Sequence, residues 1–135
     1  MTRFQATFGG LILAQAAHSI EEYAGRLWVS FPPARFVSGL ISDDLERGFL
    51  VGNVALVAFG LWCWLWPVRR ERRVAVQLAW AWVMIELVNG IGHSIWALRQ
   101  AGYTPGVATA PVLLILAIYL ALQLRLVRHG APGAS

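Results

Sequence analysis

The sequence predicts an all-α integral membrane protein, a four-helix bundle with short loops. Of its 135 residues, 58% are hydrophobic and 13% are charged, whereas about 25% of the residues of a typical soluble domain carry a charge. The sequence contains four apolar runs, each close to the length of about 20 residues that a membrane-spanning helix needs. Residues 1–135 are therefore expected to form a single transmembrane domain, with spans at about 4–23, 45–66, 74–98 and 110–126.

The first span, residues 4–23, follows Arg3 and ends in a polar cluster. Its beginning also fits a signal peptide, because a basic residue precedes a short apolar core and Ala14-Gln15-Ala16 has the small-x-small pattern of a cleavage site. Cleavage of this segment is the alternative to a first transmembrane helix.

A connector, residues 25–44, separates the first two spans. Pro32-Pro33 is expected to forbid the continuation of a helix there. Ser42-Asp43-Asp44 supplies side-chain oxygens that can cap the second span. That span contains one strongly polar residue, Asn53, and three tryptophans form an aromatic belt near its end. We expect the helix to end at Pro67.

The second half of the chain holds the other two spans. The third span, residues 74–98, carries Glu86, Asn89 and His93. Residues 102–106 have the Gly and Pro content of a turn, and the fourth span follows it.

The arginines predict the orientation of the chain in the membrane. Four of the eleven lie at residues 69–73, and there is no lysine. With both termini in the cytoplasm, seven arginines lie inside and four outside, the bias that membrane proteins favour. The net charge of +4 does not predict a nucleic-acid partner, because no basic face with interleaved aromatics lies outside the spans. Cys63 is the single cysteine, so no disulfide forms within the chain.

Polar residues inside the spans point to a buried site, since charged groups in a bilayer persist where they are paired or used. His18 and Glu22 are four residues apart, on one face of a helix, and Glu21 lies beside them. Counting about 1.5 Å per residue places His18 level with Glu86 and Asn89, Glu22 level with His93, and Asn53 close to the same layer.

Structural roles are alternatives for several of these residues. Glu22 can pair with Arg26 one turn on, and Glu21 can face the lipid headgroups. Asn53 and Asn89 can join helices by hydrogen bonds without taking part in chemistry.

The leading functional hypothesis is a metal-dependent enzyme, a hydrolase or an oxidoreductase. His18, Glu22, Glu86 and His93 would bind a divalent metal such as Zn, Fe or Mn, because these ions take imidazole and carboxylate ligands. Glu86, Glu21 and Asn89 are the predicted catalytic residues. A site at this depth implies a lipid-like substrate, such as an isoprenoid, acyl chain or polyketide, and the predicted substrate-lining residues are Asn53, Trp82, Tyr103 and Tyr119.

Two other hypotheses use the same residues. In a metal-free isomerase or cyclase, Glu86 would donate a proton, His18 or His93 would accept one, and Trp80, Trp82 or Tyr119 would stabilise a carbocation. A non-enzymatic protein, either a proton-linked carrier or an accessory membrane subunit, would use the buried groups structurally, and a carrier of this size would need a homo-oligomer.

Three motifs carry a family resemblance. Residues 18–22 read HxxEE, residues 89–93 read NxxxH and residues 103–106 read YxPG, with Thr104 where a serine is expected. In this order and spacing the chain resembles the small bacterial integral-membrane family named after its HXXEE motif. The resemblance implies a multi-pass protein of the bacterial inner membrane, and His18, Glu21, Glu22, Asn89 and His93 as signature positions. It implies no established reaction.

Overall fold

The computed structural model describes the backbone of residues 1–129 and the side chains of residues 1–126, and this part of the chain contains helices and no strand. The all-α prediction is confirmed. The helices are α1 (Arg3–Ala24), α2 (Leu27–Ser30), α3 (Pro32–Ile41), α4 (Leu45–Cys63), a π-helical turn (Trp64–Val68), α5 (Ala75–Gln100) and α6 (Ala110–His129).

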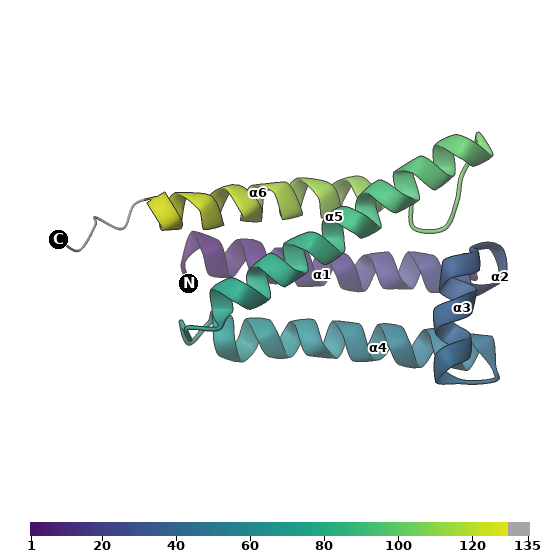
Figure 1. Ribbon diagram of the computed structural model, residues 1–135, viewed down its shortest axis with the longest axis horizontal. Helices are drawn as coiled ribbons and strands as arrows, with labels where there is room; N and C mark the ends of the chain where they lie inside the picture. The colour runs from purple at the N-terminus through teal and green to yellow at the C-terminus, as the bar shows by residue number, and fades with distance from the viewer. Residues whose placement is uncertain (130–135) are drawn as a thin grey trace.

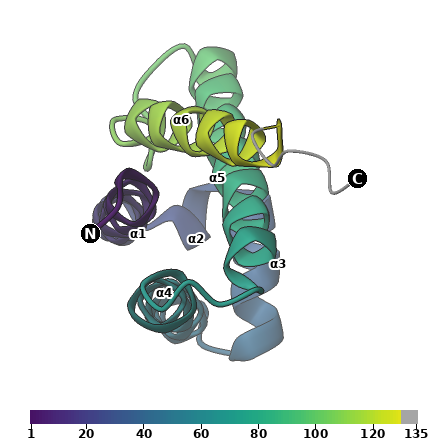
Figure 2. The same ribbon diagram turned by 90° about the vertical axis from the view of Figure 1, so that its left-hand side faces the viewer.

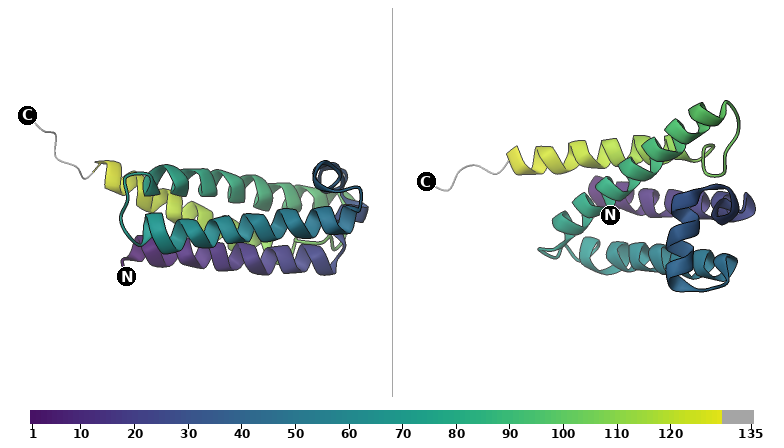
Figure 3. Two further views of the ribbon diagram at one scale, coloured as in Figure 1. Left: turned by 90° about the horizontal axis from the view of Figure 1, so that it is seen from below. Right: turned by 45° about the vertical axis from the view of Figure 1, so that its right-hand side comes forward.

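The four long helices run lengthwise through the molecule. In the end-on view of Figure 2, α1 lies between α6 and α4, and it contacts both. α5 packs against α6 and runs obliquely to the other three long helices (Figure 1), while Figure 3 shows the long helices from two further sides. Buried side chains of α1, α5 and α6 form the main core, including Phe8, Leu11, Trp82, Leu113 and Leu120.

Side-chain caps begin two of these helices. Thr2 forms a capping box with Gln5: the Thr2 hydroxyl accepts from the Gln5 backbone N–H, and the Gln5 side chain accepts from the Thr2 backbone N–H. Asp44, in the predicted capping segment, accepts from the backbone N–H of Arg47 at the start of α4. Both caps satisfy N–H groups that have no partner within the helix.

The connector between the first two spans differs from the prediction. Pro32-Pro33 does interrupt the helix, as expected, because α2 ends at Ser30 and Phe31 is extended, but the prolines also begin a new helix, α3. A proline in the first helical turn loses no hydrogen bond, and its fixed φ suits the helix. The second long helix is expected to end at Pro67. It instead continues as the π-helical turn, which contains Pro67 and reaches Val68.

Two helical segments are long and apolar enough to cross a membrane, Leu45–Val68 and Ala75–Gln100, by length and composition. The apolar stretch Ala110–Leu126 is shorter. The prediction that residues 4–23 and 110–126 are also spans therefore rests on the sequence alone. Large apolar side chains are exposed along all four long helices, for example Leu13, Val54, Val88 and Ile115.

Gly48 of α4 allows α3 to lie close across the end of α4. A Cβ atom at Gly48 would overlap the backbone carbonyl of Ser38 in α3. We therefore expect Gly48→Ala to destabilise the protein, because overpacking a tight contact costs about 1–3 kcal/mol. Thermal unfolding in detergent measures the effect.

Gly10→Ala is the matched control, since a Cβ atom at this helical glycine meets nothing within 4 Å. It should leave the melting temperature unchanged or raise it, because alanine favours a helix over glycine by about 1 kcal/mol. An equal response of the two variants would contradict the close approach of α3 to α4.

Candidate functional site

Two imidazoles and one carboxylate converge at one end of the molecule. His18 and Glu22 come from α1, and His93 comes from α5. The Glu22 Oε1 atom lies 3.3 Å from His18 Nε2 and 2.9 Å from His93 Nε2, and the two rings meet edge to face with centroids 4.7 Å apart. All three side chains are buried.

The Glu21 carboxylate is connected to His18 through hydrogen bonds to the turn before α6. It accepts hydrogen bonds from the backbone N–H groups of Ala108 and Thr109, from the Tyr103 hydroxyl and from the Thr109 hydroxyl. His18 Nδ1 lies 2.6 Å from the oxygen of that same Thr109 hydroxyl. Because the single Thr109 hydroxyl hydrogen goes to the carboxylate, His18 Nδ1 must carry the hydrogen and donate it to Thr109.

This assignment leaves the lone pair of a neutral His18 on Nε2, facing Glu22. Among the described residues, His18 Nε2 has no hydrogen-bond partner, and the buried His93 Nδ1 has none either. Two acceptor atoms, His18 Nε2 and Glu22 Oε1, thus face each other across 3.3 Å. Two acceptor atoms repel each other at this distance unless a positive charge lies between them or on one of them. That charge is either a bound metal ion or a proton on the imidazole.

The turn between α5 and α6 closes over the two histidines. Gly106 has a φ of +92°. A Cβ atom there would lie 2.5 Å from Cε1 of His93 and 2.8 Å from Cε1 of His18. Pro105 packs beside Gly25 at the end of α1, and Tyr103 binds Glu21. The YxPG segment thus contacts residues of both the other motifs.

A second polar cluster lies one helical turn away along α1. Asn89 donates to Gln15 Oε1 at 3.3 Å, Gln15 donates to Ser19 at 3.1 Å, and Ser19 donates to Asn53 at 2.6 Å. The Gln15 amide also lies 2.9 Å from Oε2 of Glu86, which is fully buried. Helices α1, α4 and α5 are joined by this cluster.

Glu86, which the sequence predicts as a metal ligand and a catalytic acid, therefore lies apart from the three-residue group that can hold a metal in the described part of the chain. Depth counting places His18 level with Glu86, but His18 meets His93, and Gln15 meets Glu86. The oblique course of α5 is the reason, because counting along parallel axes ignores such a crossing (Figure 1). Glu22 and His93 do lie level.

A groove of about 590 Å³ opens beside both clusters, with α3, α4 and α5 around it and α1 at its base. Its polar lining comes from Gln15, Glu22, Asn53, Asn89 and His93. Apolar side chains complete the walls, among them Phe31, Leu56, Met84, Ile85 and Val88. The groove thus has polar groups at its base and apolar walls.

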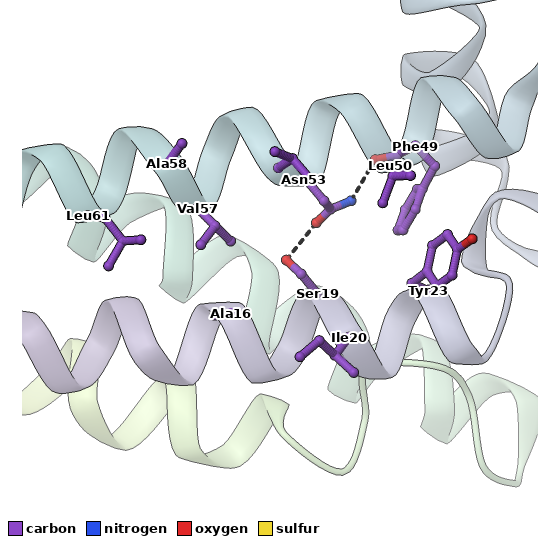
Figure 4. Close-up of a pocket in the computed structure, with 11 residues that line it drawn as sticks. Ala16, Ser19, Ile20, Tyr23, Phe49, Leu50, Asn53, Val57, Ala58 and Leu61 are labelled. Carbon is purple, nitrogen blue, oxygen red and sulfur yellow. Dashed lines mark hydrogen bonds between the residues drawn. The ribbon is translucent and has the colours of Figure 1, made fainter.

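A second groove, of about 450 Å³ and almost wholly apolar, lies between α1 and α4. Figure 4 shows its lining, with the hydrogen bond from Ser19 to Asn53 crossing between the two helices. Asn53 lines both grooves.

The other predicted substrate-lining residues lie elsewhere. Trp82 is fully buried in the main core, and Tyr119 is exposed on α6. Tyr103 is exposed in the turn, where it binds Glu21. Sequence reasoning missed Thr109, Gly106 and Gln15 as site residues. Gln15 carried a signal, as a polar residue within an apolar span, whereas nothing in the sequence marks Thr109.

Replacing Gly106 with alanine tests the fit of the turn over the histidines. We expect Gly106→Ala to lower the melting temperature, because the left-handed conformation costs a residue with a Cβ atom about 1–2 kcal/mol and the methyl group would displace both rings. In the same turn, Gly102→Ala is the control, since its Cβ atom meets only one atom, at 3.9 Å. A stable Gly106→Ala variant would contradict the contact.

Alkaline titration tests the link between Tyr103 and Glu21. The hydrogen bond to the Glu21 carboxylate raises the pKa of Tyr103 above its ordinary value. Glu21→Gln should therefore lower the pKa of Tyr103 toward about 10, measured as the part of the phenolate absorbance that Tyr103→Phe removes. Glu71→Gln, in the exposed loop before α5, should leave this pKa unchanged. An unchanged pKa in Glu21→Gln would show that the two side chains do not interact.

Comparison with known proteins places the chain in a family. It is 30% identical over 112 residues to a protein named protoheme IX farnesyltransferase from Roseiflexus sp. (strain RS-1), a match that covers 82% of this chain. The chain spans only 21% of the length of that relative. No solved structure matches the chain significantly. The family described as protein of unknown function with HXXEE motif matches residues 10–120, and the chain therefore belongs to the HXXEE-motif family.

Proposed function

We propose that this protein is a metal-dependent enzyme of the bacterial inner membrane that acts on a lipid-like substrate. The proposal rests on one observation above all: His18 Nε2 and Glu22 Oε1 face each other at 3.3 Å with no hydrogen between them in the neutral tautomer. A divalent metal such as Zn, Fe or Mn, held by His18, Glu22 and His93, satisfies all three ligand atoms.

The donor set fits a catalytic metal. Three protein ligands, drawn from imidazole and carboxylate groups, leave a coordination position for water or substrate. Glu21 acts through Thr109 to hold the His18 ring and its tautomer, as groups behind metal ligands commonly do. A bound metal would supply a Lewis acid or an activated water at the base of the groove.

The groove supports an amphiphilic substrate. Its apolar walls suit a hydrocarbon chain, and its polar base would receive an oxygen-bearing head next to Glu22 and His93. Among isoprenoids, acyl chains and polyketides, the name of the Roseiflexus relative favours an isoprenoid, because it refers to farnesyl transfer.

A membrane location, with four spans and both termini in the cytoplasm, agrees with the apolar surface. Segments Leu45–Val68 and Ala75–Gln100 meet the length and hydropathy of spans. The exposed apolar side chains of α1 and α6 would then face lipid. α3 lies crosswise at one end with Phe36 and Leu40 exposed, as a helix at the membrane surface would (Figure 1).

Metal analysis of the purified protein tests the proposal. Protein prepared in detergent without chelator should hold one Zn, Fe or Mn per chain by elemental analysis, and the His18→Ala/His93→Ala double variant should hold none. Glu21→Gln should weaken zinc affinity by about 10–100-fold, because it removes the group that orients His18, as measured by competition with a chelator.

Glu71→Gln, a carboxylate of the exposed loop, is the control and should bind metal as the wild type does. The proposal fails if the wild type contains no metal and also takes up no stoichiometric Zn²⁺, Fe²⁺ or Mn²⁺ when these are added. Such a result would favour the metal-free acid–base enzyme instead.

A further inference from the structure

In the polar cluster at the base of the groove, the donor and the acceptor of each hydrogen bond can be assigned in turn, beginning with Asn53. Asn53 Nδ2 lies 3.2 Å from the backbone carbonyl oxygen of Phe49. A carbonyl oxygen only accepts, so the nitrogen of the Asn53 amide must face Phe49 and its oxygen must face Ser19. The Ser19 hydroxyl, 2.6 Å from that oxygen, must therefore donate its single hydrogen to Asn53.

The next two connections follow from this one. With its hydrogen given to Asn53, the Ser19 oxygen accepts from Gln15, so the Gln15 nitrogen faces Ser19 at 3.1 Å. The Gln15 oxygen then faces α5, where it accepts from Asn89 Nδ2 at 3.3 Å. The same amide oxygen lies 2.9 Å from Oε2 and 3.1 Å from Oε1 of Glu86.

An ionised Glu86 does not fit at these distances. Its two oxygens would be acceptors in contact with a third acceptor, the Gln15 oxygen. Turning the Gln15 amide over would place its nitrogen against Glu86. The turned amide would then need the Ser19 hydrogen that already goes to Asn53. With a neutral carboxylic acid, the Glu86 oxygen that carries the proton donates it to the Gln15 oxygen, and the connections through Ser19 and Asn53 are kept.

We propose that Glu86 is a neutral carboxylic acid at physiological pH, donates its proton to the Gln15 oxygen, and serves as a positioning residue that sets the orientation of the amides beside the groove. Its surroundings agree with this. Glu86 is fully excluded from solvent, and the ion pairs among the described side chains involve Glu22 and the two histidines, not Glu86. A buried carboxylate without a cation is strongly disfavoured.

The two buried glutamates thereby have different surroundings. Glu22 lies between two imidazoles, and Glu86 keeps its proton one helical turn away. The assignment of Glu86 does not need the metal. Its meaning for a reaction in the groove rests on the proposed function.

The orientation also specifies part of the ligand. Asn89 lines the groove and uses its nitrogen on Gln15, so its oxygen is left as an acceptor on the groove side. No donor is paired with this oxygen among the described residues. The head of a bound amphiphile would therefore present a hydrogen-bond donor to Asn89, such as a hydroxyl group.

Infrared spectroscopy tests the protonation state directly. The protein in an ester-free detergent at neutral pH should show the carbonyl stretch of a protonated carboxylic acid, which lies at higher frequency than the carboxylate bands. The band should shift on labelling with ¹³C-glutamate and should be lost in Glu86→Gln. In Glu71→Gln, whose loop carboxylate is exposed to water, the band should remain.

Gln15→Leu keeps the test valid if Glu86→Gln does not fold. This variant removes the acceptor of the Glu86 proton and should move the band to higher frequency. The proposal is overturned if the wild type has no carboxylic acid band that responds to glutamate labelling, or if the band survives Glu86→Gln. Because the measurement is made with or without metal, loss of the metal site and loss of this band are separate results.

Discussion

The need to satisfy three glutamate carboxyls, two buried and one partly exposed, organises the rest of this structure. A buried carboxylate requires either an opposite charge or several hydrogen-bond donors, and without them it remains neutral. The molecule uses a different solution for each glutamate. Glu21 receives backbone N–H groups and two hydroxyls, Glu22 lies between two imidazoles, and Glu86 meets an amide.

These solutions require contributions from distant parts of the chain. The donors to Glu21 come from the turn before α6, so the end of α1 and this turn hold each other in place. The same turn brings Gly106 against the rings of both histidines. The three sequence motifs thus lie together: HxxEE supplies His18, Glu21 and Glu22, NxxxH supplies His93 on α5, and YxPG supplies Tyr103 and the close-fitting backbone of Gly106.

The polar site lies beside the groove that α3, α4 and α5 surround. Polar groups of α1, α4 and α5 lie at the base of the groove, and α4 and α5, which are joined at one end, lie on either side of it. A substrate entering there would meet apolar walls first and polar groups at the base.

Composition and spacing determined the helical class, the four long helices and the meeting of Glu22 with His93, because apolar run length and the helical repeat are local properties of a chain. The tertiary structure alone decided that Thr109 lies behind His18, that Gly106 covers the histidines, and that Gln15 rather than His18 lies beside Glu86. These contacts depend on the crossing of α5 and on the course of a turn, neither of which the spacing of residues along one helix records. The start of α3 at Pro32 has a similar origin, because a proline permits a first helical turn as readily as it ends a helix, and packing on α4 decides between the two.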